Sequence, residues 1–196
     1  MSSAGSRQDP GMTNSNSGGP DRVHSWEPMG DGDLATLRLL AGTATRVEGD
    51  ALARLDTVGG DELGELVVWA WVLDADRTHV LMVDHHRFGV WMAPGGRAGR
   101  GEDPLEAAAR ELFEETGATG APATTIPALV DAIGRVSPDG RLVTTFGVAF
   151  VFQADRTTEL SPEAGQPARW WPLAAPPERR NPYMWAWMFE HVTRAT

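Results

Sequence analysis

The stretch covering residues 93–118 constrains the fold most, because it joins a glycine-rich loop to an amphipathic helix. Asp103 suits the N-cap of that helix, Pro104 suits its first turn, and Glu106 follows Asp103 at capping-box spacing. Apolar side chains at helical spacing form one face of the helix: Leu105, Ala108, Ala109 and Leu112. The pattern predicts a helix over residues 104–116 that packs on a sheet.

The polar face of this helix carries three acidic side chains. Glu111, Glu114 and Glu115 stand at i, i+3 and i+4, where like charges destabilise an isolated helix. They also lie in its second half, where the helix dipole disfavours anions. We expect Arg110 to offset part of this charge by bridging Glu106 and Glu114. Such an unfavourable cluster indicates a bound cation, and ligand sets made of oxygen alone favour Mg²⁺ or Mn²⁺.

The loop before the helix, Pro94-Gly95-Gly96, supports the same interpretation. Glycine lacks a Cβ and accepts unusual backbone angles, so the backbone of this loop can come close to a ligand or a metal ion. A backbone carbonyl of the loop is therefore a candidate metal ligand. Gly117 suits the residue that ends the helix, because glycine accepts a left-handed conformation.

The whole stretch resembles the Nudix box, the signature of the Nudix hydrolase family. The residues that stand at the spacings of the box are Gly96, Glu102, Arg110, Glu111, Leu112, Glu114, Glu115 and Gly117. The departure from the pattern is Ala118, where the family usually has Ile, Leu or Val, and it concerns packing after the helix. The resemblance includes the approach strand and covers about residues 80–118, with a looser β pattern over residues 63–196.

The resemblance implies both a fold and a reaction. The fold is α/β (α+β), a Nudix-type α/β/α sandwich with a mixed β-sheet. The reaction is attack of a metal-activated water on a phosphorus atom of a nucleoside diphosphate linked to another group X. By the same resemblance, Arg110 and Glu102 orient the metal ligands. The implied ligands of Mg²⁺ (or Mn²⁺) are the Gly95 carbonyl and the carboxylates of Glu111, Glu114 and Glu115.

The general base has more than one candidate. Members of the family use either a glutamate of the box or a carboxylate from a later loop, and Glu111 is the candidate of the first kind. Candidates of the second kind lie in the loop after the strand expected at residues 141–153: Asp155, Glu159 and Glu163. For each of these loop acids, the favoured interpretation is an ordinary solvated charge rather than a general base.

Three residues outside the acidic face are candidates for contact with the substrate: Arg87, Trp91 and Phe146. An arginine such as Arg87 can pair with a phosphate. The rings of Trp91 and Phe146 can stack on a nucleobase, although alternating aromatic residues on a strand usually form sheet core.

Trp69 and Trp71 share one face of an expected strand, and their rings too can either stack on a nucleobase or form sheet core. His85 and His86 are adjacent in the sequence. On a strand they would point to opposite faces, so we do not expect them to form a joint metal site.

The remaining chain divides into three segments. Residues 1–32 are polar with almost no apolar pattern, which predicts a disordered tail. Residues 33–62 form an expected helical element, with Asp33 as the cap of its first helix and a second helix at about residues 50–57. Residues 63–196 form the expected Nudix domain. Its expected elements are strands near residues 65–73, 79–83, 125–136, 141–153 and 169–173, a turn at 137–140 and a last helix over 182–193.

Composition limits both chemistry and partners. The chain has no Cys, which excludes disulfides and thiolate nucleophiles, and no Lys, which excludes a lysine Schiff base. Its formal net charge of −10 offers no broad basic surface, so nucleic acid is not an expected partner. Without a long apolar run or a signal-peptide core, we expect no membrane association and a cytoplasmic location. A homodimer is an alternative to internal packing for the C-terminal tryptophans.

The expected function is hydrolysis of a small nucleotide, with nucleoside triphosphates and nucleotide sugars as equally suitable substrates. The alternative is a Nudix-fold module that senses a nucleotide without cleaving it, which the complete box disfavours. A scaffold role for residues 1–32 is disfavoured, because this segment lacks the apolar anchors of a docking helix. A role on RNA caps is disfavoured, because the sequence shows no basic patch.

Overall fold

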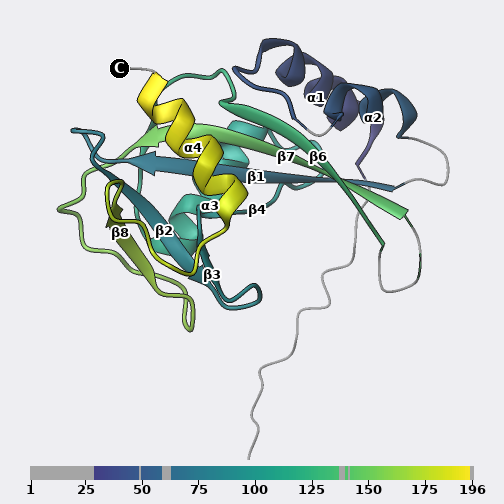
Figure 1. The fold of residues 1–196 in the computed structure, drawn as a ribbon. Helices are drawn as coiled ribbons and strands as arrows, with labels where there is room; N and C mark the ends of the chain where they lie inside the picture. Colours follow the sequence, from purple (N-terminus) through teal and green to yellow (C-terminus); the bar gives the residue numbers. More distant parts are fainter. Residues whose placement is uncertain (1–28, 49, 59–62, 137–139, 141, 195–196) are drawn as a thin grey trace, which may run out of the picture.

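The chain folds into three layers in its computed structural model, which describes residues 29–48, 50–58, 63–136, 140 and 142–194. In chain order the elements are α1 (Asp31–Thr43), α2 (Ala51–Thr57), β1 (Leu63–Leu73), β2 (His79–His85), β3 (Val90–Met92), β4 (Gly95–Arg97), α3 (Pro104–Thr116), β5 (Ala121–Pro122), β6 (Leu129–Val136), β7 (Leu142–Gln153), β8 (Ala168–Pro172) and α4 (Pro182–Arg194). Figure 1 shows α4 in front of the sheet, α3 behind it, and α1 and α2 beside one end. The expected α/β/α sandwich is confirmed.

The sheet is mixed, and β1 lies at its centre. β1 runs parallel to β7 along its whole length, from the pair Leu63–Val143 to the pair Leu73–Gln153. The other pairings are antiparallel: β1 with β2 and β4, β2 with β3 and β8, and β7 with β5 and β6. Helices cover both faces of β1, which explains why its sequence LVVWAWVL is a continuous apolar run.

Two apolar cores flank the sheet. The core on the side of α1, α2 and α3 includes the buried side chains of Leu37, Leu55, Leu112, Phe146 and Phe150. The core under α4 includes those of Trp71, Val80, Val151, Trp185 and Met188. Successive residues of β1 and β7 alternate between the two cores, because neighbouring side chains of a strand point to opposite faces.

The N-terminal helix α1 begins at Asp31 rather than at Asp33. Its N-cap is Gly30, in an extended conformation with φ −92° and ψ 173°, and the backbone N–H of Gly30 donates to the Asp33 carboxylate at 2.7 Å. The expectation that Asp33 caps this helix is therefore wrong, because Asp33 already lies inside its first turn. Most of the expected disordered tail, residues 1–28, lies outside the described residues.

The longer strands and the last helix lie close to their expected positions. β6 begins at Leu129 rather than near residue 125, because Pro127 has no N–H for the strand ladder. The expected turn at residues 137–140 lies largely outside the described residues. The approach strand expected before the helix occurs as two short strands, β3 and β4, and β5 was not expected, because it is too short to show a periodic pattern. In the described part of the chain, no helix is both long and apolar enough to cross a bilayer.

Candidate active site

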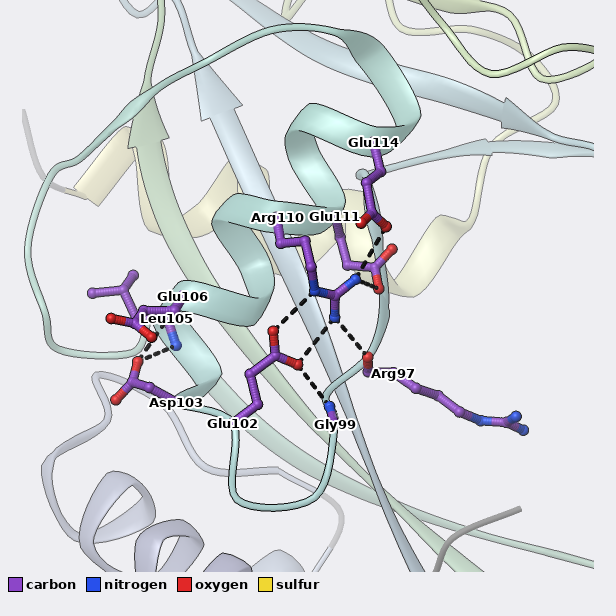
Figure 2. Close-up of polar contacts among 9 residues, drawn as sticks. All are labelled: Arg97, Gly99, Glu102, Asp103, Leu105, Glu106, Arg110, Glu111 and Glu114. Atoms are coloured by element: carbon purple, nitrogen blue, oxygen red, sulfur yellow. Dashed lines mark hydrogen bonds and ion pairs between the residues drawn. The ribbon is translucent and has the colours of Figure 1, made fainter. Parts of the chain in front are cut away.

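The helix α3 has the boundaries and the cap that its sequence predicts. The Asp103 carboxylate accepts hydrogen bonds from the backbone N–H groups of Leu105 at 2.9 Å and Glu106 at 3.1 Å (Figure 2). The helix ends at Gly117, whose φ of 71° lies in the left-handed region. The apolar face is rotated slightly from the expected one: Ala107 is fully buried, whereas Ala109 is exposed.

Arg110 lies at the centre of the acidic cluster (Figure 2). Its guanidinium makes a bidentate contact with Glu102, at 2.9 and 3.1 Å. The same group donates to Glu111 at 2.7 Å, to Glu114 at 3.1 Å and to the backbone carbonyl of Arg97 at 3.1 Å. The expected partner Glu106 is thus replaced by Glu102, which the preceding loop brings next to the helix.

The contact between Arg110 and Glu102 is electrostatically strong. The hydrogen bond from Arg110 lowers the pKa of Glu102, and the bond to Glu102 raises the pKa of Arg110. Glu102 also accepts a hydrogen bond from the backbone N–H of Gly99 at 2.7 Å. Together these bonds hold the Gly99–Glu102 loop against the middle of α3.

Glu111 is largely buried and packs against the glycine loop. Burial raises the pKa of its carboxyl group, although the hydrogen bond from Arg110 lowers it. A Cβ atom on residue 96 would lie 2.5 Å from the carboxyl carbon of Glu111, closer than atoms can approach. Gly96 is therefore the residue that leaves room for the Glu111 carboxylate.

Glu115 is the most buried acid of the three, with 7% of its surface exposed. Its carboxylate accepts hydrogen bonds from the backbone N–H of Gly95 at 2.8 Å and from the side-chain amide of Gln166 at 2.6 Å. The pKa of Glu115 is raised to about 7, mainly by burial; the negative charges of Glu111 and Glu163 also raise it, whereas the hydrogen bonds from Gly95 and Gln166 lower it. Its described hydrogen-bond donors are neutral, so they leave its negative charge uncompensated.

These donor groups fit a hard divalent cation. The carboxylates of Glu111 and Glu115 are shielded from solvent by the glycine loop, and the negative charge of Glu111 raises the pKa of Glu115. Glu114 is exposed and bound to Arg110. Among the described residues, no three acidic or histidine side chains already converge as a ligand cluster. A metal site shared by all three glutamates therefore requires Glu114 to turn away from Arg110.

The structure does not bring the three expected substrate residues together. The expectation for Phe146 is wrong, because strand alternation points its side chain into the core beneath α3 with 0% exposure. Arg87 lies exposed in the turn after β2, 5.8 Å from the centre of the Phe88 ring. Trp91 is half-buried and packs edge-on against Trp171, with ring centres 5.2 Å apart.

The two histidines at the end of β2 also differ from expectation. His86 has left the strand, so its ring stacks on His85 with centres 5.4 Å apart and an angle of 21°. The expectation of opposite faces is wrong, because it assumed that the strand continued through His86. The Nδ1 atom of His86 also lies 3.1 Å from Oε1 of Gln166, the residue that holds Glu115.

Gln166 is a site residue that sequence reasoning missed. It is 1% exposed and lies in the loop between β7 and β8, outside any motif. No local pattern could have indicated its contact with Glu115, which is 51 residues away in the chain. In the same loop, the charge of Glu163 acts on Glu115, whereas Asp155 is exposed and bound within its own turn to Thr157.

Comparison with known proteins agrees with this geometry. The family model of the NUDIX domain matches residues 65–191, more than half of the chain. The chain belongs to the NUDIX family. It is a Nudix hydrolase, an enzyme that cleaves pyrophosphate bonds in small nucleotide derivatives, and such enzymes generally use divalent metal ions. The matched segment begins in β1 and ends in α4, so α1 and α2 lie outside it.

Solved structures of Nudix proteins resemble the fold. A hydrolase of the NUDIX family from Clostridium perfringens is 18% identical, with a TM-score of 0.54, over 67% of this chain and 97% of that chain. The MutT protein from Methanosarcina mazei Go1 is 21% identical, with a TM-score of 0.47, over 70% of this chain and 98% of that chain. A search of curated proteins found no match.

Proposed function

We propose that this Nudix hydrolase uses Mg²⁺, with Mn²⁺ as the alternative, to hydrolyse a small nucleotide: a nucleoside diphosphate linked to another group X. Nucleoside triphosphates and nucleotide sugars are the two substrate types. The observation that carries the proposal is the pair of buried carboxylates, Glu111 and Glu115, packed against the backbone of Gly95 and Gly96. A divalent cation is the partner that compensates these charges.

In this proposal the carboxylates of Glu111, Glu114 and Glu115 and the carbonyl of Gly95 hold the cation. When bound, the cation neutralises charge on the phosphate oxygens and acidifies the attacking water. Arg110 and Glu102 orient the ligands, since Arg110 touches Glu111 and Glu114 and is itself held by Glu102.

The general base remains a choice between a box glutamate and a loop acid. Among the loop acids, the described contacts favour Glu163 over Asp155, because the Glu163 charge acts on Glu115. The backbone N–H of Ser161 also donates to the Thr116 carbonyl at 2.8 Å, which ties this loop to the end of α3. We therefore propose Glu163 as the base, with Glu111 as the alternative.

The substrate ring is proposed to lie on the α4 side of the sheet, beside Trp69. The Trp69 ring is half-buried. It packs on the glycine loop so closely that a Cβ on Gly95 would lie 2.5 Å from Cε3 of Trp69. A nucleobase stacked on Trp69 would place its phosphates next to Glu115. Arg87 stays a proposed partner for a phosphate, and Trp91 a secondary ring contact.

A screen of purified full-length protein tests this function. Nucleoside triphosphates and nucleotide sugars are incubated with Mg²⁺ or Mn²⁺, and the products are identified by mass. Glu115→Gln is compared with Glu106→Gln, which makes the same chemical change at an exposed position of the same helix. We expect Glu115→Gln to lower kcat by about 100-fold or more, and Glu106→Gln to retain turnover.

Near-normal turnover of Glu115→Gln would overturn the assignment of the site. Tight nucleotide binding by the wild-type protein without any product would instead support the sensing module. Circular dichroism and thermal unfolding of both variants show whether a loss of turnover reflects the site or the fold.

A further inference from the structure

Asp33 connects the N-terminal helix to the loop of the Nudix box. One oxygen of its carboxylate accepts from the backbone N–H of Gly30 at 2.7 Å, and the other accepts from the backbone N–H of Gly101 at 2.9 Å. The side chain is 8% exposed, so solvent competes little for these bonds. Asp33 lies outside residues 65–191, the segment that the NUDIX family model matches.

We propose that Asp33 is a positioning residue of the active site, and that α1 is a working part of the enzyme. This inference rests on the proposed function of the acidic cluster. Asp33 acts through Gly101 on Glu102, the residue that holds Arg110 among the glutamates. It does not itself touch the metal ligands.

The loop between β4 and α3 transmits this contact over a short path. Gly101 adopts a left-handed conformation with φ 72°, which reverses the chain immediately before Glu102. The backbone N–H of Glu102 donates to the Gly99 carbonyl at 3.0 Å, and its carboxylate accepts from the Gly99 N–H at 2.7 Å. The loop is thus a small closed turn, so a displacement of Gly101 moves Glu102 with it.

The helix that carries Asp33, α1, is packed into the core of the domain. Leu37 and Ala41 of α1 are buried in the same core as Leu112 of α3, so the two helices share one packed support. The side chain of Arg100 also packs on the N-cap of α1, because a Cβ on Gly30 would lie 3.1 Å from two of its guanidinium nitrogens. The Asp33 carboxylate therefore joins the loop to a rigid element.

Both oxygens of Asp33 are used, and this makes the residue hard to replace. Asparagine has a single acceptor oxygen, so Asp33→Asn can keep one of the two bonds and leaves the other N–H unpaired. If Gly101 is released, Glu102 holds Arg110 less well, and Arg110 competes more with the metal ion for Glu111 and Glu114. A small displacement of a catalytic group lowers the rate strongly while leaving substrate binding nearly intact.

The experiment compares full-length Asp33→Asn and Asp33→Ala with Asp31→Asn. The control removes the same charge from the same helical turn at an exposed position. For Asp33→Asn we expect kcat to fall by about tenfold, KM for the nucleotide to stay within about twofold, and the Mg²⁺ concentration for half-maximal rate to rise severalfold. Asp31→Asn keeps the wild-type values. If Asp33→Ala does not fold, Asp33→Asn alone decides.

A double-mutant comparison separates positioning from general stabilisation. Asp33→Asn is introduced into a Glu102→Gln background, and kcat is measured. If Asp33 acts through Glu102, its loss adds little to the effect of Glu102→Gln. Equal kcat values and Mg²⁺ requirements for Asp33→Asn and Asp31→Asn, or fully additive losses in the double mutant, would overturn the inference.

Hydrogen exchange keeps the inference testable apart from catalysis. In metal-free wild-type protein and Asp33→Asn, amide exchange is measured across residues 99–102. Faster exchange there, with unchanged exchange in α3, supports the contact, and unchanged exchange in the loop overturns it. A wild-type protein that hydrolyses no nucleotide would overturn the proposed function, while the exchange result would still judge the link between α1 and the loop.

Discussion

Gly96 and Glu111 show how one residue type determines the position of a carboxylate in the proposed site. A Cβ on residue 96 would lie 2.5 Å from the carboxyl carbon of Glu111 and 2.6 Å from both carboxylate oxygens. The clash involves the end of a flexible side chain, so the backbone can stay in place while the carboxylate moves. Residue 96 therefore affects the site more than the fold.

We expect Gly96→Ala to lower kcat by about 100-fold and to change the free energy of unfolding by only about 1 kcal/mol. Mg²⁺-dependent turnover and urea unfolding measure the two effects. Gly42→Ala on α1 is the matched control, because a Cβ there meets no atom within 4 Å. Wild-type turnover in Gly96→Ala would show that Glu111 tolerates displacement and is not a metal ligand.

At the scale of elements, a buried carboxylate, that of Asp74, stabilises the connection from β1 to β2 beside its backbone hydrogen bonds. Asp74 is 4% exposed and accepts hydrogen bonds from the Thr78 N–H at 2.7 Å, the Thr78 hydroxyl at 3.0 Å and the His79 N–H at 2.9 Å. Burial raises the pKa of Asp74, but these hydrogen bonds together outweigh it, so the pKa lies below its ordinary value of 3.8. The ionised carboxylate therefore stabilises the folded state.

This stabilisation is complete above the ordinary pKa of 3.8 and is lost as the pH falls through the lower pKa of the folded protein. Asp74→Asn should lower the free energy of unfolding by about 1–3 kcal/mol at pH 7, and the difference from wild type should shrink below about pH 4. Urea unfolding between pH 3 and pH 7 measures it, with exposed Asp76→Asn as the control. A difference that does not depend on pH would contradict the charge argument.

The longest elements were predictable because their signals are local. The helix α3 has its cap, its apolar face and its terminating glycine within consecutive residues, and it occurs where expected. The strand β4 shows the opposite case. Glycines have little tendency to form strands, and β4 exists because Gly95 and Gly96 pair with Trp69 and Val68 of β1.

At the scale of the whole molecule, negative charge dominates. The formal net charge is −10, and two of the carboxylates that contribute to it, Glu111 and Glu115, lie largely buried in the site. A cation that binds the folded chain and not the unfolded chain shifts the folding equilibrium toward the folded state. The proposed metal site therefore predicts a stability effect as well as an activity.

Mg²⁺ should raise the melting temperature of the wild-type protein. A concentration about 100-fold above the dissociation constant adds about 2.7 kcal/mol to the free energy of unfolding. Removal of metal with a chelator should reverse the shift, and Glu115→Gln should reduce it. Thermal unfolding in NaCl of matched ionic strength is the control. An equal shift in NaCl would mean that general charge screening, rather than a metal site, causes the effect.

The sequence by itself determined the family, the α3 helix and the acids that share its polar face, because the spacings of one helix and its cap are short-range properties. It could not determine which face of the sheet α3 would cover. That choice, made by packing of the whole sheet, buries Phe146 under α3 and leaves Trp69 beside Gly95 on the other face.

Only the tertiary structure decided which distant residues complete the site. Gln166 reaches Glu115 from the loop before β8, and Asp33 reaches Gly101 from α1. The bonds span 51 and 68 residues, far beyond the range of any helix or strand period. Such contacts arise when separate elements pack on a common core, so the acids of the site were predictable while the residues that hold them in place were not.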